Sequence, residues 1–127
     1  MPIMTLEIPA KNWPLFCDKI NAQAHDIISI RLNKSDGKTQ TVAENVPLVS
    51  MLFQPQTGAC SDLLMIAMGG PNERPAQHEV FEPIRIVLRK NFEGNRFNQL
   101  EILAENGTTE VQFRPGIEPA LLENLGM

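Results

Sequence analysis

The sequence predicts an α+β domain in which one amphipathic helix packs on a twisted antiparallel sheet of about seven strands. Apolar residues near the N-terminus recur at helical spacing, whereas much of the remaining chain alternates with a period of two between Gly, Asn and Pro turn signals. A sheet of this size must twist, so it forms either an open sheet or a partial barrel. The 127 residues, 43% of them apolar, suit a single domain covering residues 1–127.

The N-terminal region predicts a strand followed by the helix. Residues 3–8 alternate weakly, and Pro9 ends that strand because proline cannot donate to a β-ladder. The helix begins near Asn12 or Trp13, since Pro14 fits best in a first turn. We expect its apolar stripe to pack on the sheet; this stripe contains Trp13, Phe16, Cys17, Ile20 and Ala24.

From residue 27 the period changes to two, which predicts a half-buried strand. Asp36-Gly37 predicts a tight hairpin turn, because glycine tolerates the positive φ that such a turn requires. Residues 39–44 return as a strand. Residues 46–54 form another strand, and Pro47 places its beginning at an edge or a bulge.

Residues 63–68 are apolar at nearly every position. This pattern predicts a central strand that is covered on both faces, and it marks the best core candidate. Residues 69–77 contain two glycines and two prolines and predict the longest loop. Gly69-Gly70 lacks the Lys-Ser/Thr of a phosphate-binding loop, so a hinge or turn is expected there.

A first hairpin with its turn near Asn95 places Arg89 opposite Glu101 and Arg85 opposite Glu105. The Arg/Glu pairs then lie on the solvent side of the sheet. The basic residues of this region are therefore expected to be neutralised within the domain; they are Arg85, Arg89, Lys90 and Arg96.

A second hairpin is predicted by Asn106-Gly107 as a two-residue type I′ turn. In this register Ile102 faces Val111 and Leu100 faces Phe113. Both hairpins assign the same residues to the buried face, namely Leu100, Ile102 and Ala104, which supports the strand assignment.

The C-terminal residues 118–125 predict a short helix, with Pro119 in its first turn and Gly126 past its end. A helix this short is marginal alone, so its apolar side chains need a cover. That cover is either the domain itself or a second copy, which makes this segment a candidate for self-association. The side chains concerned are Leu121, Leu122 and Leu125.

The charge balance argues against two classes of partner. A net charge of −4 opposes the basic surface that phosphate contacts require, so binding to nucleic acid or to an anionic membrane is disfavoured. The N-terminus lacks a secretory signal, and no apolar run is long enough to span a bilayer. We therefore expect a cytoplasmic protein with reduced thiols at Cys17 and Cys60.

The sequence carries no recognisable metal or cofactor site. The two cysteines could meet His25 and His78 around zinc, but no close ligand pair announces such a site, so no metal or cofactor is expected. His25 closes the predicted helix, where an imidazolium suits the negative end of the helix dipole.

His78, Glu82 and Arg85 are the candidate ligand-binding residues. Together they could serve acid–base chemistry, and His78 and Glu82 share a face if the segment is one strand. No nucleophile in a recognisable setting accompanies them, so no catalytic residue is assigned and His78 is expected to be an ordinary strand-end histidine.

A spread of short motifs resembles a small bacterial family of unknown function. They are Ile8-Pro9, Trp13, Phe16, Pro47-Leu48, His78, Pro83, Gly107-Thr108-Thr109 and Phe113. The resemblance covers most of the chain and implies one domain, but it carries no activity and no catalytic residues.

Three hypotheses for the function follow from these features. The first is a non-enzymatic binding or assembly module that self-associates. The second is a small-ligand-binding protein with a pocket between helix and sheet, roofed by residues 69–77. The third is an enzyme that uses His78 with Glu82 and Arg85 converging in a cleft.

Overall fold

The computed structural model describes residues 3–23, 27–55, 62–69, 76–91, 96–105 and 107–122, together with Leu125. These residues form one α-helix, α1 (Trp13–Gln23), and two short 3-10 helices, η1 (Ala10–Asn12) and η2 (Pro119–Leu122). The strands are β1 (Ile3–Ile8), β2 (Ile27–Lys34), β3 (Thr39–Gln54), β4 (Leu63–Met68), β5 (Ala76–Phe81), β6 (Arg85–Asn91), β7 (Phe97–Ala104) and β8 (Gly107–Ile117). None of the described helices has the length and apolar character needed to span a bilayer.

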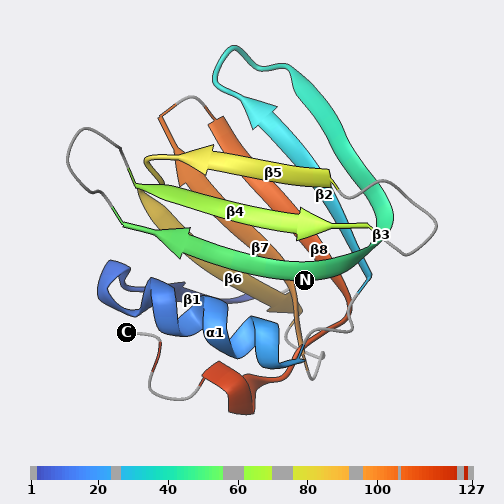
Figure 1. Ribbon diagram of the computed structural model, residues 1–127. Coiled ribbons are helices and arrows are strands. Elements are labelled where there is room, and N and C mark those ends of the chain that lie inside the picture. The colour runs from blue at the N-terminus through green and yellow to red at the C-terminus, as the bar shows by residue number, and fades with distance from the viewer. Residues whose placement is uncertain are drawn as a thin grey trace.

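The strands form one antiparallel sheet in the order β1-β6-β7-β8-β2-β3-β4-β5. The predicted antiparallel sheet with an N-terminal helix is therefore confirmed. The sheet folds over, so that β3, β4 and β5 lie in front of β6, β7 and β8, with α1 along one side (Figure 1). Because β1 and β5 are the two ends of this order, the sheet is open rather than closed into a barrel.

Strand β3 joins the two layers. Its first half, Thr39–Pro47, pairs with β2, and its second half, Leu48–Gln54, pairs with β4. The sequence predicted two strands here, but the structure has one of 16 residues. The predicted break instead appears as a distortion within the strand, because Asn45 adopts φ 52° while its amide donates to Ser29 Oγ at 3.0 Å.

The core fills the space between the two layers and α1. The predicted helical stripe is buried as far as it is described, with Trp13, Phe16, Cys17 and Ile20 each at most 4% exposed. The Trp13 indole donates a hydrogen bond to the Ile8 carbonyl at 2.8 Å. Its ring packs edge-to-face on Phe53, with 5.4 Å between the ring centroids. This contact attaches the start of the helix to both β1 and β3.

The two C-terminal hairpins bury the predicted face, although both registers differ by two residues from the predicted ones. Leu100 pairs with Leu88 and Val111, and Ile102 pairs with Ile86. A shift of two residues leaves every side chain on its own face, whereas a shift of one would reverse them all. Leu100 and Ile102 are fully buried, and Ala104 packs against the core.

Gly107 explains why the second register was wrong. Ala104 pairs with Gly107, so the glycine is the first residue of β8 rather than a turn residue. A Cβ on Gly107 would lie 2.5 Å from the Asn33 carbonyl oxygen. The glycine therefore permits the close approach of β2 and β8 instead of forming the turn.

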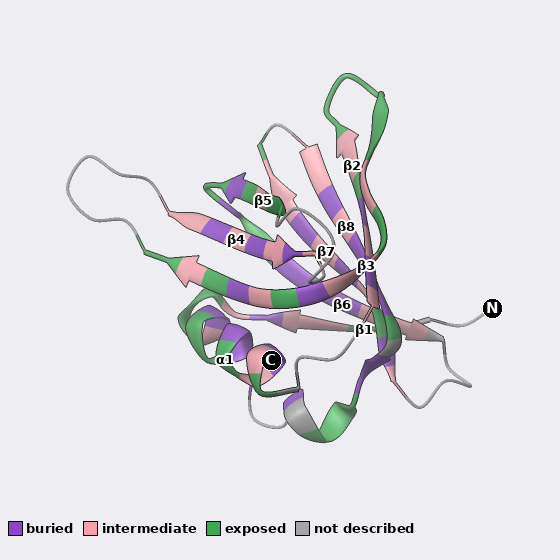
Figure 2. Cartoon of the chain, turned by 45° about the vertical axis from the view of Figure 1, so that its right-hand side comes forward, coloured by how far each residue is buried: buried purple, intermediate pink, exposed green. Residues whose placement is uncertain are grey.

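Among the described residues, β4 is fully buried on one face only, which corrects the prediction of a strand covered on both faces. Leu64, Ile66 and Met68 point into the core and are at most 2% exposed. The residues between them are only partly buried, as the alternating bands of β4 in Figure 2 illustrate. The apolar run is therefore longer than this fold needs for its own core.

The C-terminal helix was predicted too long. Its regular part is the four-residue 3-10 helix η2, and the residues after it are described only at Leu125. Leu122 and Leu125 are 4% and 0% exposed within the single chain, and Asn12 Nδ2 donates to the Leu125 carbonyl at 2.8 Å. These leucines dock beside α1, which supplies the cover that so short a helix needs.

Asn21 on α1 acts as a substitute strand partner for β3. The second half of β3 has β4 on one side, and its other edge lies next to the helix. The Asn21 carboxamide donates to the Met51 carbonyl at 2.8 Å and accepts from the Met51 amide at 2.7 Å. Both polar groups of this backbone unit are therefore satisfied without a neighbouring strand.

We predict that Asn21→Ala lowers the free energy of unfolding by about 1–3 kcal/mol, because it leaves a part-buried amide and carbonyl without partners. Asn21→Asp should also destabilise the fold, since its carboxylate still accepts from the Met51 amide but faces the Met51 carbonyl without a donor. Urea unfolding measures both. The exposed neighbour Asp18 provides the control, and a loss from Asp18→Ala as large as that from Asn21→Ala would contradict this role.

Candidate functional site

The structure places His78, Glu82 and Arg85 in three different settings. His78 lies on β5 and points between the layers, whereas Arg85 begins β6 on the solvent side and forms an ion pair with Glu7. Glu82 is exposed in the turn between these strands at φ 52°, and its amide donates to the Asp62 carbonyl at 2.8 Å. The segment is thus not one strand, and the structure does not gather the three side chains in one cavity.

His78 joins the two layers of the fold. Its Nε2 lies 3.1 Å from the hydroxyl of Thr109 on β8, and Thr109 is only 2% exposed. Burial lowers the pKa of His78 from its ordinary value, and the nearby Glu79 carboxylate opposes this shift more weakly. The imidazole is therefore neutral at neutral pH and shares a hydrogen bond with the hydroxyl of an almost fully buried threonine.

The cavity beside His78 is too small for a substrate of ordinary size. It measures about 50 Å³ and is bounded by apolar side chains, including Leu32, Val80 and Ala104, as well as by Thr109. A few water molecules fill such a volume. A histidine next to a hydroxyl is the arrangement of an activated nucleophile, but here the hydroxyl is buried beneath the strands. The pair is best explained as a contact that holds β5 on β8.

The remaining sequence candidates are structural or lie outside the described residues. Cys17 is 2% exposed, and burial, assisted by the Asp18 charge, raises the pKa of its thiol to about 12. A thiol with such a pKa is a poor nucleophile. His25 and Cys60 lie outside the described residues. Among the residues that are described, no group of three or more His, Cys, Asp or Glu side chains could hold a metal ion.

The basic residues of β6 and β7 are largely paired. The predicted pair of Arg89 with Glu101 is present at 2.9 Å. Arg85 pairs with Glu7 of β1 rather than with the predicted Glu105, because β1 is the neighbour of β6 on that side. Two further contacts complete the set: Arg96 with Glu118 at 2.8 Å, and Lys90 over the Phe97 ring at 5.3 Å.

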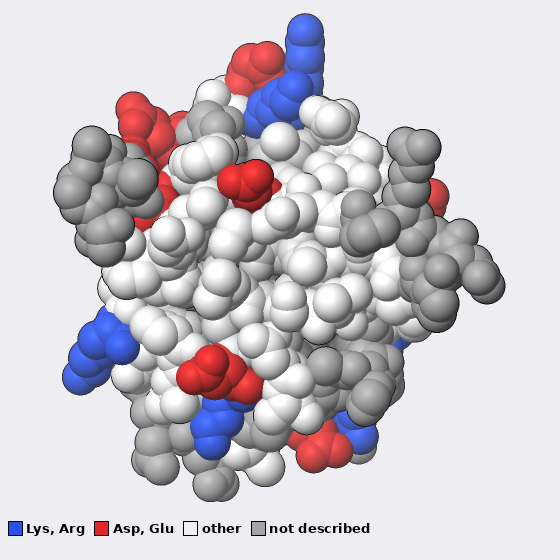
Figure 3. Space-filling view, in the orientation of Figure 1, with Lys and Arg blue, Asp and Glu red and all other residues white. Residues whose placement is uncertain are grey.

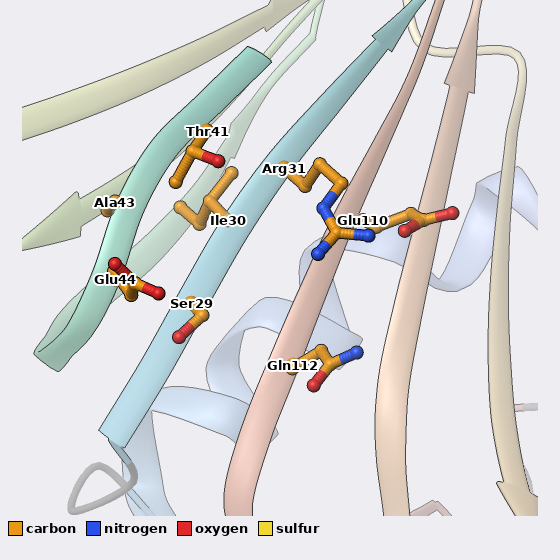
Figure 4. A pocket seen from close by; sticks show the side chains of 8 residues that line it. All are labelled: Ser29, Ile30, Arg31, Thr41, Ala43, Glu44, Glu110 and Gln112. Carbon is orange, nitrogen blue, oxygen red and sulfur yellow. The ribbon is translucent and has the colours of Figure 1, made fainter. Parts of the chain in front are cut away.

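A polar groove that sequence reasoning missed lies on the outer side of β2, β3 and β8. Its volume is about 180 Å³. Arg31 extends from β2 towards Glu110 on β8, whereas Glu44 of β3 lies on the other side of β2 near Ser29 (Figure 4). The remaining lining residues are Ile30, Thr41, Ala43 and Gln112. The only local signal for this groove was Asn45, a residue type that tolerates the left-handed conformation.

An uncharged surface covers the outside of the front layer. We define the outer apolar face as Leu52, Leu63, Met65, Ala67 and Phe81, which the registers of β3, β4 and β5 place on the solvent side. Leu52 and Phe81 are 52% and 60% exposed. Figure 3 views this layer from outside, and uncharged side chains occupy most of its middle.

Neither cavity corresponds to the pocket predicted between helix and sheet. The lining residues of both belong to strands, their turns or strand ends, and none comes from α1. The apolar side chains of α1 instead pack into the core. Most of the predicted roof, residues 70–75, lies outside the described residues.

The His78 contact makes stability depend on pH with a definite sign. Because the pKa is lower in the folded state than in the unfolded chain, the stabilising effect is complete above the unfolded value of 6.5 and is lost as the pH falls below it. We expect the wild type to lose more stability than His78→Gln between pH 7 and pH 5. Urea unfolding across this range measures the free energy of unfolding of both proteins. If it falls equally in both as the pH is lowered, His78 does not cause the pH dependence.

Comparison with known proteins assigns a family but no activity. A search of curated proteins and a search of solved structures returned no match. A family model matches residues 4–119, which is nearly the whole chain, and its description is "Family of unknown function (DUF5335)". The chain therefore belongs to this family of unknown function.

Proposed function

We propose that this protein is a non-enzymatic assembly module that forms a homodimer through its outer apolar face. The observation that carries the proposal is the mismatch in β4, whose apolar run suits a strand covered on both faces, while the described residues fully bury only one face. Leu63, Met65 and Ala67 are the β4 residues left at the surface. A second sheet packed on them would supply the missing cover.

The charge distribution favours a second copy as the occupant. Each chain carries a net charge of −4, so two copies repel unless they meet through surface that is poor in charge. The middle of the front layer meets that condition (Figure 3). A basic partner would instead be drawn to the carboxylates, which this face largely lacks.

We place the interface on the outer apolar face rather than on the C-terminal segment. Leu122 and Leu125 are buried against the chain that contains them, and the contact from Asn12 to Leu125 holds the segment in place. Self-association through this segment would require it to undock. The outer apolar face needs no rearrangement, because Leu52 and Phe81 are already exposed.

The size of the face predicts a weak dimer. Three strands about 4.8 Å apart and six residues long, with a rise of about 3.3 Å per residue, present roughly 300 Å² per copy. A standard stable interface uses about 800 Å² per partner. The expected dimer therefore dissociates with a Kd of roughly 0.1 mM and forms only at high concentration.

We predict that Leu52→Lys abolishes dimerisation, because it replaces an apolar contact with an ammonium that the interface would have to desolvate. Sedimentation equilibrium from about 5 μM to 1 mM should show the wild-type mass rising above 14.2 kDa, while the variant remains a monomer. Ile84→Lys is the matched control, since Ile84 is 60% exposed but lies in the turn before β6. A wild type that stays monomeric at 1 mM, or equal loss in both variants, contradicts the proposal.

A substitution at Glu79 should strengthen the dimer instead of weakening it. It pairs with Met65 in the register of β4 and β5, so its exposed carboxylate lies within the same face. Burial against a second copy desolvates this charge and brings it near its equivalent. Glu79→Gln should therefore tighten the dimer by roughly 3–10-fold in sedimentation equilibrium. Weakened or unchanged association would show that the face is not the contact.

A further inference from the structure

Arg31 differs from the other arginines that the structure describes. Arg85, Arg89 and Arg96 each pair with a glutamate, and Arg114 donates to Asn45 Oδ1 at 2.6 Å. The Arg31 side chain, in contrast, forms no hydrogen bond and no ion pair within 4.0 Å with any described residue. Its guanidinium, with five donors in a planar fork, lies in the groove over β2 and β8 (Figure 4).

The groove results from an irregular stretch of sheet. The register between β2 and β3 shifts on both sides of Ile30, and Asn45 turns left-handed at φ 52°. The Ser29 hydroxyl stabilises that conformation by accepting a hydrogen bond from the Asn45 amide. Arg114 donates a hydrogen bond to the Asn45 side chain. Hydrogen bonds from two strands thus maintain a hollow where a regular sheet would be filled.

Charges of both signs line this hollow. Glu110 pairs with Arg31 in the β2–β8 register, and Glu44 stands on β3 at the opposite side of β2. Neither carboxylate forms an ion pair with another described residue within 4.0 Å. Thr41 and Gln112 add neutral donors and acceptors. The set matches a ligand that carries one carboxylate and one ammonium.

We propose that the groove binds a small zwitterion of amino-acid size, with its carboxylate on Arg31 and its ammonium on Glu44 or Glu110. Arginine recognises a carboxylate through two parallel hydrogen bonds, which gives the ligand an orientation. The volume of about 180 Å³ is below that of pockets for drug-sized ligands and suits roughly ten non-hydrogen atoms or fewer.

The open position of the groove sets the expected affinity. Arg31 and Glu44 are exposed, so water screens their contacts with a ligand. Arg31 can also turn to Glu110, so an ion pair within the chain would compete with the ligand carboxylate. The expected Kd therefore lies in the range of roughly 1–10 mM.

Titration of the full chain with glycine and with 4-aminobutyrate tests the proposal, because these probes separate the two charges by different lengths. Backbone amide NMR should show saturable shifts at 29–31, 41–44 and 110–112 with at least one of them. Arg31→Gln should weaken binding about tenfold or more. Arg89→Gln, on the same side of the sheet but paired with Glu101, should leave binding unchanged.

Acetate and methylammonium complete the titration by presenting each charge alone. Both should bind at least threefold more weakly than the better zwitterion. Acetate that binds as tightly as the better zwitterion would overturn the zwitterion assignment. The proposal would also fail if neither zwitterion saturates the protein up to about 100 mM, or if Arg31→Gln binds as tightly as the wild type. Arg31→Lys serves if the glutamine variant fails to fold, since it keeps the charge but loses the two-pronged contact.

Discussion

The double pairing of β3 is the constraint on which the rest of this structure depends. One strand of 16 residues pairs first with β2 and then with β4, so it must leave one layer and enter the other. Leaving β2 exposes an edge of backbone, which Asn21 of α1 satisfies at Met51. The same transition produces the distorted stretch around Asn45 that opens the groove. The helix position and the groove are thus consequences of how one strand changes partners.

The buried faces could be predicted from the sequence because they depend on a local period of two. The predicted buried face was correct although both predicted registers were wrong. Each register error was two residues, which leaves Leu100 and Ile102 on the buried face. The errors themselves have non-local causes. Gly107 reads as a turn residue in isolation, but the approach of Asn33 from β2 is what requires it. Arg85 likewise pairs with Glu7, which is 78 residues away in the chain.

The candidate site was much less predictable than the core. His78, Glu82 and Arg85 were grouped because they are close in sequence, yet a turn separates His78 from Arg85 and places them on opposite sides of the sheet. The groove combines Arg31, Glu44 and Glu110, which come from three strands. Its existence depends on the register shifts between β2 and β3 around Ile30. Hydrophobic periodicity carries no information about such irregularities.

The two outer surfaces of the sheet differ in the side chains that they expose to solvent. Behind β6 and β7, charged side chains neutralise one another, as in the pair of Arg89 with Glu101, so this surface needs no further cover. The front layer exposes Leu52 and Phe81 instead, and only burial of these side chains yields a hydrophobic gain.

The outer apolar face and the groove belong to different layers, so a second copy on one leaves the other open. Their only common element is β3, through its second and first halves respectively. Any coupling between dimerisation and ligand binding must therefore pass through the distortion at Asn45, where the strand changes partners. Hydrogen bonds from Ser29 and Arg114 hold that distortion in place and oppose any change that a ligand beside it would favour. The two surfaces should consequently act independently.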